Sequence, residues 1–580
     1  MLHGGAMAFL TTAALPRERT IVNFASLAIL LPLLDKLDIA GIIDRHLPAD
    51  PQAEFSHGAV LRILLAARLH QPTALVNLAD WAAEHGVEYL CNLPAEKLND
   101  DRLGRALDAF FEQRYSILAS VTAEALRITG LDLKRAHFDP THLVLYGAYA
   151  DSKPRPATKL DGLIDQLKDT PAHLTRGYLS KYKMLQLGVT SVVDDLGALP
   201  IACHVYDGNR NGHTGVKEQY HLLRNTLNLP ADFLFVSDRG TCSAEHLATL
   251  RAHGHHGLCA GQWQDYQPLY EQHADKLSWQ KASYLSAEQQ RRRQCNSSLP
   301  REEYRLAVVK HQLIDSATNT PFDCRVLFVH STASAKESKE RREKNIRKIR
   351  DGLDAIARKL EKGHSSTTPE SVARQITKLL GKKSAANLFR WELVPLTEAE
   401  QAARPKPTKG HRGQTHRLVH SFDAAAAKAD ERQDGIYALV TTAPLTWSGD
   451  ALLIEYKRQT FVERGHHELK TPLAVNPIFL KTPRRIEALV SLLFLALQAY
   501  MTLERLYRQS VPIHAQATQG RMTAERILKK FHSCHLIVEY QPYGELLQVA
   551  RLTSEQQSIL TQLSFATPTE ILKQHHLPPP

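Results

Sequence analysis

The sequence has little of what disulfide-rich, membrane-spanning or secreted proteins are built from. Seven of its 580 residues are cysteines, the closest two are 17 residues apart, and no Cys-x-x-Cys or zinc-ligand spacing occurs. The longest apolar run, 488–496, is too short to cross a bilayer, and the first twenty residues lack a basic stretch ahead of an apolar core. We therefore expect a soluble cytoplasmic protein with no membrane partner and no disulfide framework.

Two motifs of reactive sites are present only in part. The segment Gly381 to Ser384 resembles a phosphate-binding loop, but Ile376 stands at the first glycine position and Lys383 where Ser or Thr should follow the lysine. Glu463 and His466 have the spacing of a di-iron ligand pair, but such a site also requires a second Glu-x-x-His pair on a facing helix. We expect neither site.

The net charge of +11 arises in one segment. Residues 331–420 contain 21 Lys and Arg against 10 Asp and Glu, so the rest of the chain is neutral overall. Apolar residues recur every three or four positions across 336–362, which predicts one amphipathic helix with a narrow apolar seam. The seam consists of Ile346, Ile349, Leu353, Ile356 and Leu360.

The basic side chains of this helix are expected to face either DNA or only solvent. They are Arg341, Arg342, Lys344, Arg347, Lys348 and Arg350. Further along, Pro405, Pro407, Gly410 and Gly413 predict a basic, linker-like loop. A polyanionic partner therefore has to be sought on this segment rather than on the whole protein.

The sequence pattern changes at Leu131. After a loose tail at 1–16, the spacing is helical from Thr20 to about Gly130, and 99–101 supply N-cap residues for the last helix. This predicts an all-α unit that is either a plain helical domain or a DNA-binding one. Beyond Leu131, short strands alternate with helices as in α/β proteins, at 136–139, 142–146, 184–193, 199–206, 233–237, 306–309, 324–330 and 435–441. Helices return at 449–509, and the tail after them is helical in part.

Two aspartates lie on these predicted strands. Asp238 ends the buried run 234–237 and precedes a glycine turn, which is where α/β sheets present ligands and catalytic groups. Asp139 lies within the first strand, where a lone ionised carboxylate is costly unless it is paired or binds a metal. The plainer alternatives are a helix cap for Asp238 and a turn residue before proline for Asp139.

A third carboxylate lies in the predicted helix 456–470. Tyr456, Glu463 and Lys470 are spaced by seven residues and so share one stripe of that helix. A phenol, a carboxylate and a cation on one face suit a metal ion beside a phosphate backbone. A salt-bridged surface helix is the plainer alternative.

These three elements together resemble the DDE transposases of bacterial insertion sequences. The resemblance is to the branch whose third carboxylate lies in a Tyr-x2-Arg-x3-Glu-x6-Lys signature, and it extends from about Ser26 to beyond Tyr500. Further matching stretches are Gly188-Val189, Asp194, 197–200, Gly208-Asn209, Leu480-Lys481 and 485–489. One position departs, because Gln459 stands where the signature has Arg, with Arg458 beside it.

The resemblance implies a fold and a domain order. The expected fold is an α/β RNase H-like catalytic core, a mixed sheet with flanking helices, joined to an all-α N-terminal domain and an inserted α+β or helical domain. Asp139 and Asp238 are 99 residues apart and Glu463 follows after 225 more, a gap long enough for the insertion. The expected segments are a flexible tail (1–16), a helical DNA-binding domain (17–130), a catalytic domain in two parts (131–260 and 431–510), a basic insertion (261–430) and a helical tail (511–580).

The resemblance also implies chemistry. Asp139, Asp238 and Glu463 would hold two divalent ions, Mg²⁺ or Mn²⁺, for DNA strand cleavage and strand transfer. Tyr456, Arg458, Gln459 and Lys470, with Arg347 and Lys348 of the basic segment, would contact DNA. The partners would be duplex DNA, as terminal inverted repeats and target, and at least one further copy of the chain, in the bacterial cytoplasm at the nucleoid.

Two other functions stay open at this point. One is a non-catalytic DNA-binding or regulatory protein derived from a transposase. The other is an RNase H-like nuclease that cuts without strand transfer.

Overall fold

The chain forms two compact units in the computed structural model. The first contains Met1–Cys259, Ile314–Phe322 and Glu455–Pro580, and the second contains Ala260–Leu313 and Asp323–Ile454. The structure describes residues 18–48, 53–156, 159–160, 162–177, 181–286, 289, 302–361, 368–381, 383, 385–403, 414–471, 473, 478, 480–511, 522–542 and 544–576. The predicted tail at 1–16 and the predicted basic loop around Pro405 to Gly413 lie outside these residues.

The N-terminal part of the first unit is mainly helical, as predicted. Asn99 caps its longest helix, since its side chain accepts a hydrogen bond from the backbone N–H of Arg102. The helices are α1 (Leu27–Lys36), α2 (Ile39–His46), α3 (His57–His70), α4 (Leu78–Glu84), α5 (Val87–Cys91) and α6 (Asp100–Thr129), with 3-10 turns at Leu75–Asn77 and Ala95–Leu98.

The prediction that the chain is helical from Thr20 onward is wrong at its start. Residues Arg19–Val22 form strand β1, which pairs antiparallel with β14 (Leu536–Gln541), and β14 pairs with β15 (Gly544–Val549). A strand of four residues whose partner lies more than 500 residues away gives almost no local signal. The C-terminal tail is helical in part, as expected, at α20 (Ala524–Lys530), α21 (Ser554–Leu563) and α22 (Pro568–His576).

The centre of the first unit is a mixed sheet. Its strands are β2 (Arg135–Leu145), β3 (Thr175–Arg176), β4 (Lys183–Asp194), β5 (Gly197–Asp207), β6 (Leu234–Ser237) and β7 (His256–Ala260), in the order β3-β4-β2-β6-β7 with β5 beside β4. Strand β6 pairs parallel with β2 and with β7, whereas β4 pairs antiparallel with β2 and with β5. The two predicted runs at 136–139 and 142–146 are one continuous strand, which passes through Pro140.

Helices cover both faces of this sheet. On one face Phe138 and Phe235 pack with Tyr220 of α8 (Gly212–Thr226) and Leu250 of α9 (Ala244–Ala252). On the other face, apolar residues of β2, β4 and β5 join the core formed with α6 and α18 (Pro483–Ser510). A short helix, α7 (Leu163–Lys168), lies in the connection before β3. This mixed sheet with flanking helices fits the predicted RNase H-like core; the predicted domain boundaries stay predictions.

Helix α18 is largely buried in the first unit. By length and composition it could cross a membrane, but its apolar window is entirely buried inside the protein, as in a core helix. It also carries a buried carboxylate, Glu487, which accepts hydrogen bonds from Arg114, Arg155 and the backbone N–H of Ala172. Two guanidinium groups compensate this buried charge and fasten α6 and the segment around Arg155 to α18.

The second unit contains an antiparallel sheet and a long helix. Strand β10 (Thr320–Ser331) pairs with β13 (Ile436–Thr441), and β9 (Tyr304–Asp315) lies between β10 and β8 (Gln280–Lys281). Its other elements are α10 (Trp263–His273), α12 (Thr332–Glu361), α13 (Pro369–Leu380), β11 (Phe389–Pro395), α14 (Glu398–Ala402), β12 (His416–Phe422) and α15 (Ala424–Glu431).

The predicted amphipathic helix is confirmed as α12. Its seam packs against α13, β11 and β12, with Ile349, Leu353 and Leu360 buried. One predicted basic side chain is not free, because Arg342 is only 8% exposed and pairs with Asp434 and Glu431. The sequence gives no sign of this pairing, since the two acids lie about ninety residues further along the chain.

Candidate active site

Asp139 lies in the middle of β2, beside the parallel strand β6. Phe138 is opposite Ser237 in that pairing, so Asp139 and Asp238 follow as the next residues on neighbouring strands. Adjacent strands lie about 4.8 Å apart. The parallel register therefore brings the first two predicted carboxylates together.

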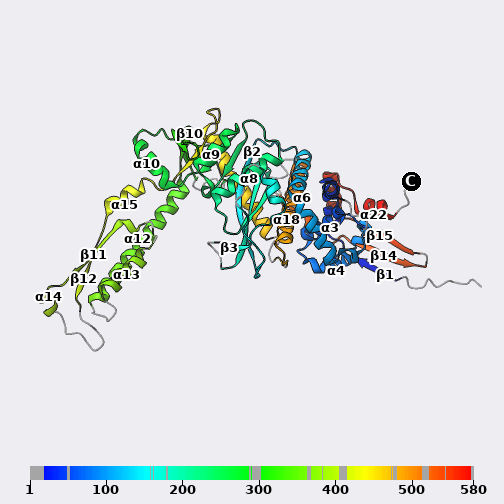
Figure 1. Ribbon diagram of the computed structural model, residues 1–580, viewed down its shortest axis with the longest axis horizontal. Helices are drawn as coiled ribbons and strands as arrows, with labels where there is room; N and C mark the ends of the chain where they lie inside the picture. Colours follow the sequence, from blue (N-terminus) through cyan, green and yellow to red (C-terminus); the bar gives the residue numbers. More distant parts are fainter. Residues whose placement is uncertain are drawn as a thin grey trace, which may run out of the picture. The chain divides into compact units, whose positions relative to one another are not determined.

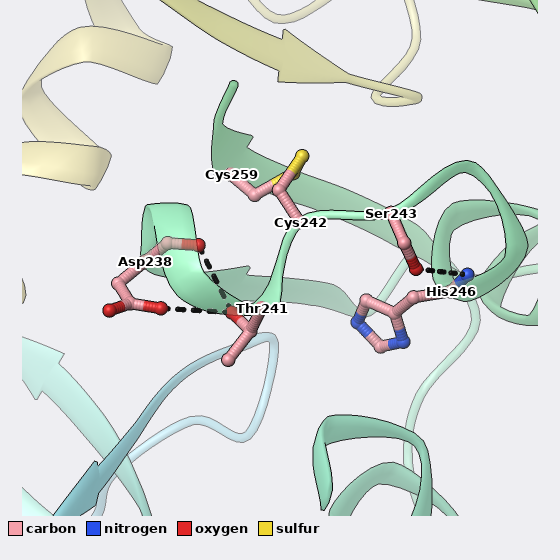
Figure 2. Close-up of a disulfide and its surroundings, with 6 residues drawn as sticks. All are labelled: Asp238, Thr241, Cys242, Ser243, His246 and Cys259. Carbon is pink, nitrogen blue, oxygen red and sulfur yellow. Dashed lines mark hydrogen bonds between the residues drawn. A yellow bond between two sulfur atoms is a disulfide. The ribbon is translucent and has the colours of Figure 1, made fainter. Parts of the chain in front are cut away.

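The Asp238 carboxylate is held by the turn that follows β6. The Thr241 hydroxyl donates to Asp238 Oδ1 over 3.1 Å and to the Asp238 carbonyl oxygen over 3.0 Å, as Figure 2 shows. Burial and then the negative charge of Asp139 raise the pKa of Asp238, although hydrogen bonds from Thr241 and the backbone oppose this. Asp238 does not cap α9, because Ser243 does so by accepting from the His246 N–H over 3.2 Å. The helix-cap alternative is thereby removed for α9, and at the short 3-10 turn Arg239–Thr241 Asp238 occupies the N-cap position without a side-chain cap hydrogen bond.

A disulfide joins this turn to the next strand. Cys242 and Cys259 are bonded, with Cα atoms 5.6 Å apart, and Figure 2 shows the bond between the turn and β7. The sequence predicts no disulfide framework, and it does not predict this single disulfide. The pairing of β6 with β7 puts Cys259 opposite Ser237, and the 3-10 turn Arg239–Thr241 then brings Cys242 beside Cys259, which the spacing of the two cysteines along the chain does not reveal.

The predicted helix 456–470 is two helices. Tyr456 lies in α16 (Gly449–Lys457), whereas Glu463 and Lys470 lie in α17 (Gln459–Lys470), and the chain turns at Arg458 between them. The side chains of Tyr456 and Lys470 nevertheless lie close enough to the aspartates to interact with them electrostatically. Burial raises the pKa of Tyr456 to about 12, and the charges of Asp238, Glu463 and Asp139 add to this rise, opposed by Arg239.

Lys470 also lies near the site. Burial lowers the pKa of Lys470, and the carboxylate of Asp139 opposes that change. Tyr456 and Lys470 therefore both sense the acidic residues, as the stripe predicted from their spacing requires. Glu463 is exposed.

Gln459, at the signature position of Arg, is turned into the protein. Its side chain is 8% exposed, its Oε1 lies 3.0 Å from His137 Nδ1, and its Nε2 donates to the Phe138 carbonyl over 3.1 Å. Both ends of the amide are thus used on β2, next to Asp139. The predicted DNA contact of Gln459 stays a prediction.

A buried carboxylate completes this contact between β2 and the helices. Glu455 of α16 accepts from His137 Nε2 over 2.9 Å, from Arg135 over 2.8 Å and from Arg458 over 3.0 Å. We call Glu455, His137 and Gln459 the clamp. Because it ties α16 and α17 to β2, it fixes Tyr456 and Glu463 relative to Asp139.

The other predicted DNA contacts are placed differently. Arg458 pairs with Glu455 and, over 2.7 Å, with Asp195. Arg347 and Lys348 are exposed on α12 of the second unit. Their roles stay predictions.

His466 is a site residue that the sequence does not assign. Its Nδ1 lies 3.1 Å from Asp139 Oδ2, and its side chain is 10% exposed. The Glu-x-x-His spacing is the only sign of it in the sequence, since it places His466 one helical turn after Glu463. Thr241, His137 and Glu455 are missed as well, because only the fold brings them to the aspartates.

The donor chemistry at this place suits a hard divalent cation, since carboxylate oxygens are what Mg²⁺ and Mn²⁺ prefer. The pKa of Asp238 supports a cation at this place. Burial and the negative charge of Asp139 raise that pKa, and a bound cation would relieve the repulsion between the two carboxylates. Within the part of the chain that the structure describes, no group of three or more His, Cys, Asp or Glu side chains is gathered closely enough to hold a metal. The carboxylates are thus the type of ligand that such a cation prefers. For all three to bind it, Glu463 would have to lie closer to Asp139 and Asp238.

The fold and this site define an α/β protein with an acidic centre at adjoining strands of a mixed sheet. Residues 152–498, more than half of the chain, match the family described as transposase DDE domain, so the chain belongs to that family and is a transposase. Asp238 and Glu463 lie inside the matched range, and Asp139 lies 13 residues before it.

Other comparisons add less. Residues 20–123 match a domain of unknown function (DUF4277). No curated protein matches the chain. The cryo-EM structure of a piggyBac transposase synaptic complex with hairpin DNA is similar over 97% of this chain and 85% of that one, at 9% identity and a TM-score of 0.34, which is too low to bear on the site.

Proposed function

We propose that the chain is the transposase of a bacterial insertion sequence, of the branch with the Tyr-Arg-Glu-Lys signature, and that Asp139, Asp238 and Glu463 are its catalytic carboxylates. The observation that carries this is the pairing of β2 with β6, which brings Asp139 beside Asp238. Tyr456, whose phenol senses all three carboxylates, supports the inclusion of Glu463.

These three residues would hold two divalent ions, Mg²⁺ or Mn²⁺. When bound, the ions would supply positive charge to the reacting phosphate and its oxygens. Thr241 orients the Asp238 carboxylate, and the clamp keeps the helix that carries Glu463 against β2. Preorganisation of this kind is what phosphoryl transfer needs from a protein.

The reaction would be an exchange of phosphodiester bonds. Water attacks the phosphorus at the transposon end and the freed 3′-hydroxyl becomes the next nucleophile. That hydroxyl then attacks a target phosphodiester, and the target's own 3′-oxygen leaves. One phosphodiester replaces another, so ATP is not required.

DNA would be held near the site by Tyr456 and Lys470, which sense the acids without forming part of the clamp. The partners are two transposon ends, a target duplex and at least one further copy of the chain, because both ends have to be joined. The N-terminal helices are proposed to bind DNA as well. Cytoplasmic localisation stays a prediction.

The test is a cleavage and joining assay. The full-length protein is incubated with Mg²⁺, a plasmid target and a labelled duplex containing the inverted repeat next to its gene. Joined products support the transposase; cuts without joined products support the nuclease; binding alone supports the regulatory protein.

A variant assigns the chemistry to the acidic site. We expect Glu463→Gln to bind the labelled duplex as the wild type does and to lose cleavage by at least 100-fold, a typical loss for a group acting on the transition state. The control is Glu525→Gln, which changes an exposed acid paired with Lys529 in the same unit. Full cleavage by Glu463→Gln would refute the assignment.

A further inference from the structure

Helices α12 and α13 enclose a groove in the second unit that the catalytic site does not use. The two helices lie side by side (Figure 1) and pack against one another. The groove has a volume of about 440 Å³. Its lining consists of Lys348, Gly352, Ala355, Ile356 and Lys359 from α12, Gln375, Lys378 and Leu379 from α13, and Lys383 beyond it.

The groove follows from the spacing of small residues on α12. Lys348, Gly352, Ala355 and Lys359 are four, three and four residues apart, so they form one stripe along the helix. Gly352 and Ala355 leave its middle low, and a Cβ added at Gly352 would lie 2.6 Å from the Leu379 side chain. The two helices therefore approach closely at the floor, while lysines stand at the rim.

The helix pair beneath the groove is packed firmly. Ile349 and Leu353 of α12 and Val372 and Ile376 of α13 are buried in a common core. Thr368 caps α13 through a hydrogen bond from the Ser371 N–H. The rim lysines thus project from a fixed base.

The charge of the lining is of one sign. Four of its nine residues are lysines and none is a carboxylate. Among the residues that the structure describes, Lys348, Lys359 and Lys378 have no ion-pair partner, and Lys383 donates to the Leu379 carbonyl oxygen. Like charges held together on one groove repel, and a polyanion removes that repulsion.

We propose that this groove binds the sugar-phosphate backbone of duplex DNA. Lys348 and Lys359 are eleven residues apart on α12, which is about 16 Å along the helix. A strand of B-DNA advances about 3.4 Å per phosphate, so the stripe faces about five phosphates. Lysines bind phosphate as point charges, and Gln375 is the only other polar side chain of the lining, so the contact does not depend on base sequence.

This proposal rests on the proposed function, and it changes which residues of the basic segment are expected to contact DNA. The sequence singles out the cluster from Arg341 to Arg350, of which Arg342 is buried in ion pairs. The groove instead takes Lys348 from that cluster and adds three lysines to it: Lys359, Lys378 and Lys383.

The experiment compares two variants of the full-length protein with equal loss of charge. The groove variant carries Lys348→Gln, Lys359→Gln, Lys378→Gln and Lys383→Gln. The control carries Lys276→Gln, Lys310→Gln, Lys339→Gln and Lys428→Gln, four exposed lysines of the same unit that do not line the groove. Glutamine keeps the helix propensity close to that of lysine.

The measurement is the Kd for duplex DNA across a salt series, with the terminal repeat and with a random duplex. Each phosphate contact contributes about 0.9 to the slope of log Kd against log salt. We expect the groove variant to lose a slope of about 3 and to bind both duplexes at least tenfold more weakly, with their affinity ratio unchanged. The control should keep the wild-type slope. Circular dichroism and thermal melting of both variants establish that they fold.

An unchanged slope in the groove variant, or an equal loss in the control, would overturn the groove. These outcomes are separate from a failure of the proposed function, because wild-type cleavage and joining with Mg²⁺ are measured on the same duplex. A wild type that binds no DNA would overturn both.

Discussion

Replacing Gln459 by Arg would restore the residue of the family signature, and we predict that it weakens the enzyme. The change removes two hydrogen bonds, to His137 Nδ1 and to the Phe138 carbonyl oxygen. Each contributes about 1 kcal/mol, and a buried group left without a partner costs about 1–3 kcal/mol. The new guanidinium would also enter a position that is 8% exposed, where Glu455 is already shared among His137, Arg135 and Arg458. We expect the contact between β2 and α17 to lose about 2–4 kcal/mol.

The assay is hydrogen–deuterium exchange of the full-length protein. A loss of about 2–4 kcal/mol corresponds to an increase in exchange of roughly 30- to 1000-fold in peptides from β2 and α17. Cleavage should fall with it, because Glu463 and Asp139 are no longer held together. The control is Gln557→Arg, at an exposed glutamine of α21. Unchanged exchange with equal or faster cleavage would refute the clamp, since an arginine would then fit without loss.

Two further predictions concern the same part of the fold. Burial alone would raise the pKa of Glu455, but hydrogen bonds and charges from His137 and Arg135 lower it to about 2 from 4.5. A carboxylate with a lowered pKa stabilises the fold above its unfolded pKa and ceases to do so as the pH falls, here from about 4.5 towards 2. Glu455→Gln should therefore cost about 3 kcal/mol in urea unfolding at pH 7 and less than half of that at pH 3; an equal cost at both would contradict the pairing. Cys242→Ser should lower stability in oxidising buffer by about 3 kcal/mol, as expected for a loop of this length, and thermal melting in dithiothreitol should show no difference from the wild type. A difference that persists under reduction would mean that the thiol's packing, not the disulfide, is responsible.

Local sequence patterns predict the helices and strands of this protein well, because the apolar periodicity of each element is contained within its own residues. The strands that carry Asp139 and Asp238 are found from short apolar runs, and α12 from its seam. Such runs do not specify which strands pair with one another in the sheet. The pairing of β1 with β14 and the disulfide from Cys242 to Cys259 both depend on strand order, so sequence spacing gives no warning of either.

The helix that carries Glu463 shows how far spacing can lead. A seven-residue spacing puts Tyr456 and Glu463 on one stripe, and the charge of Glu463 still reaches the Tyr456 phenol although the chain turns at Arg458 between them. Arg458 keeps backbone angles of the αR region, so the break introduces no extended residue between the two side chains.

The residues that support the site could not be predicted from their spacing. A spacing rule specifies the face of a helix and leaves the partner undefined. Glu463 and His466, one turn apart, have the spacing of a di-iron ligand pair, but the fold gives His466 a different partner, Asp139. In the sequence, Gln459 likewise departs from the family signature at a position expected to contact DNA. In the structure, its amide contacts His137 Nδ1 and the Phe138 carbonyl oxygen of β2. An arginine at this place would need a free anion or a path to solvent, and the clamp provides neither. The substitution therefore follows from what β2 and Glu455 offer, which only the three-dimensional structure contains.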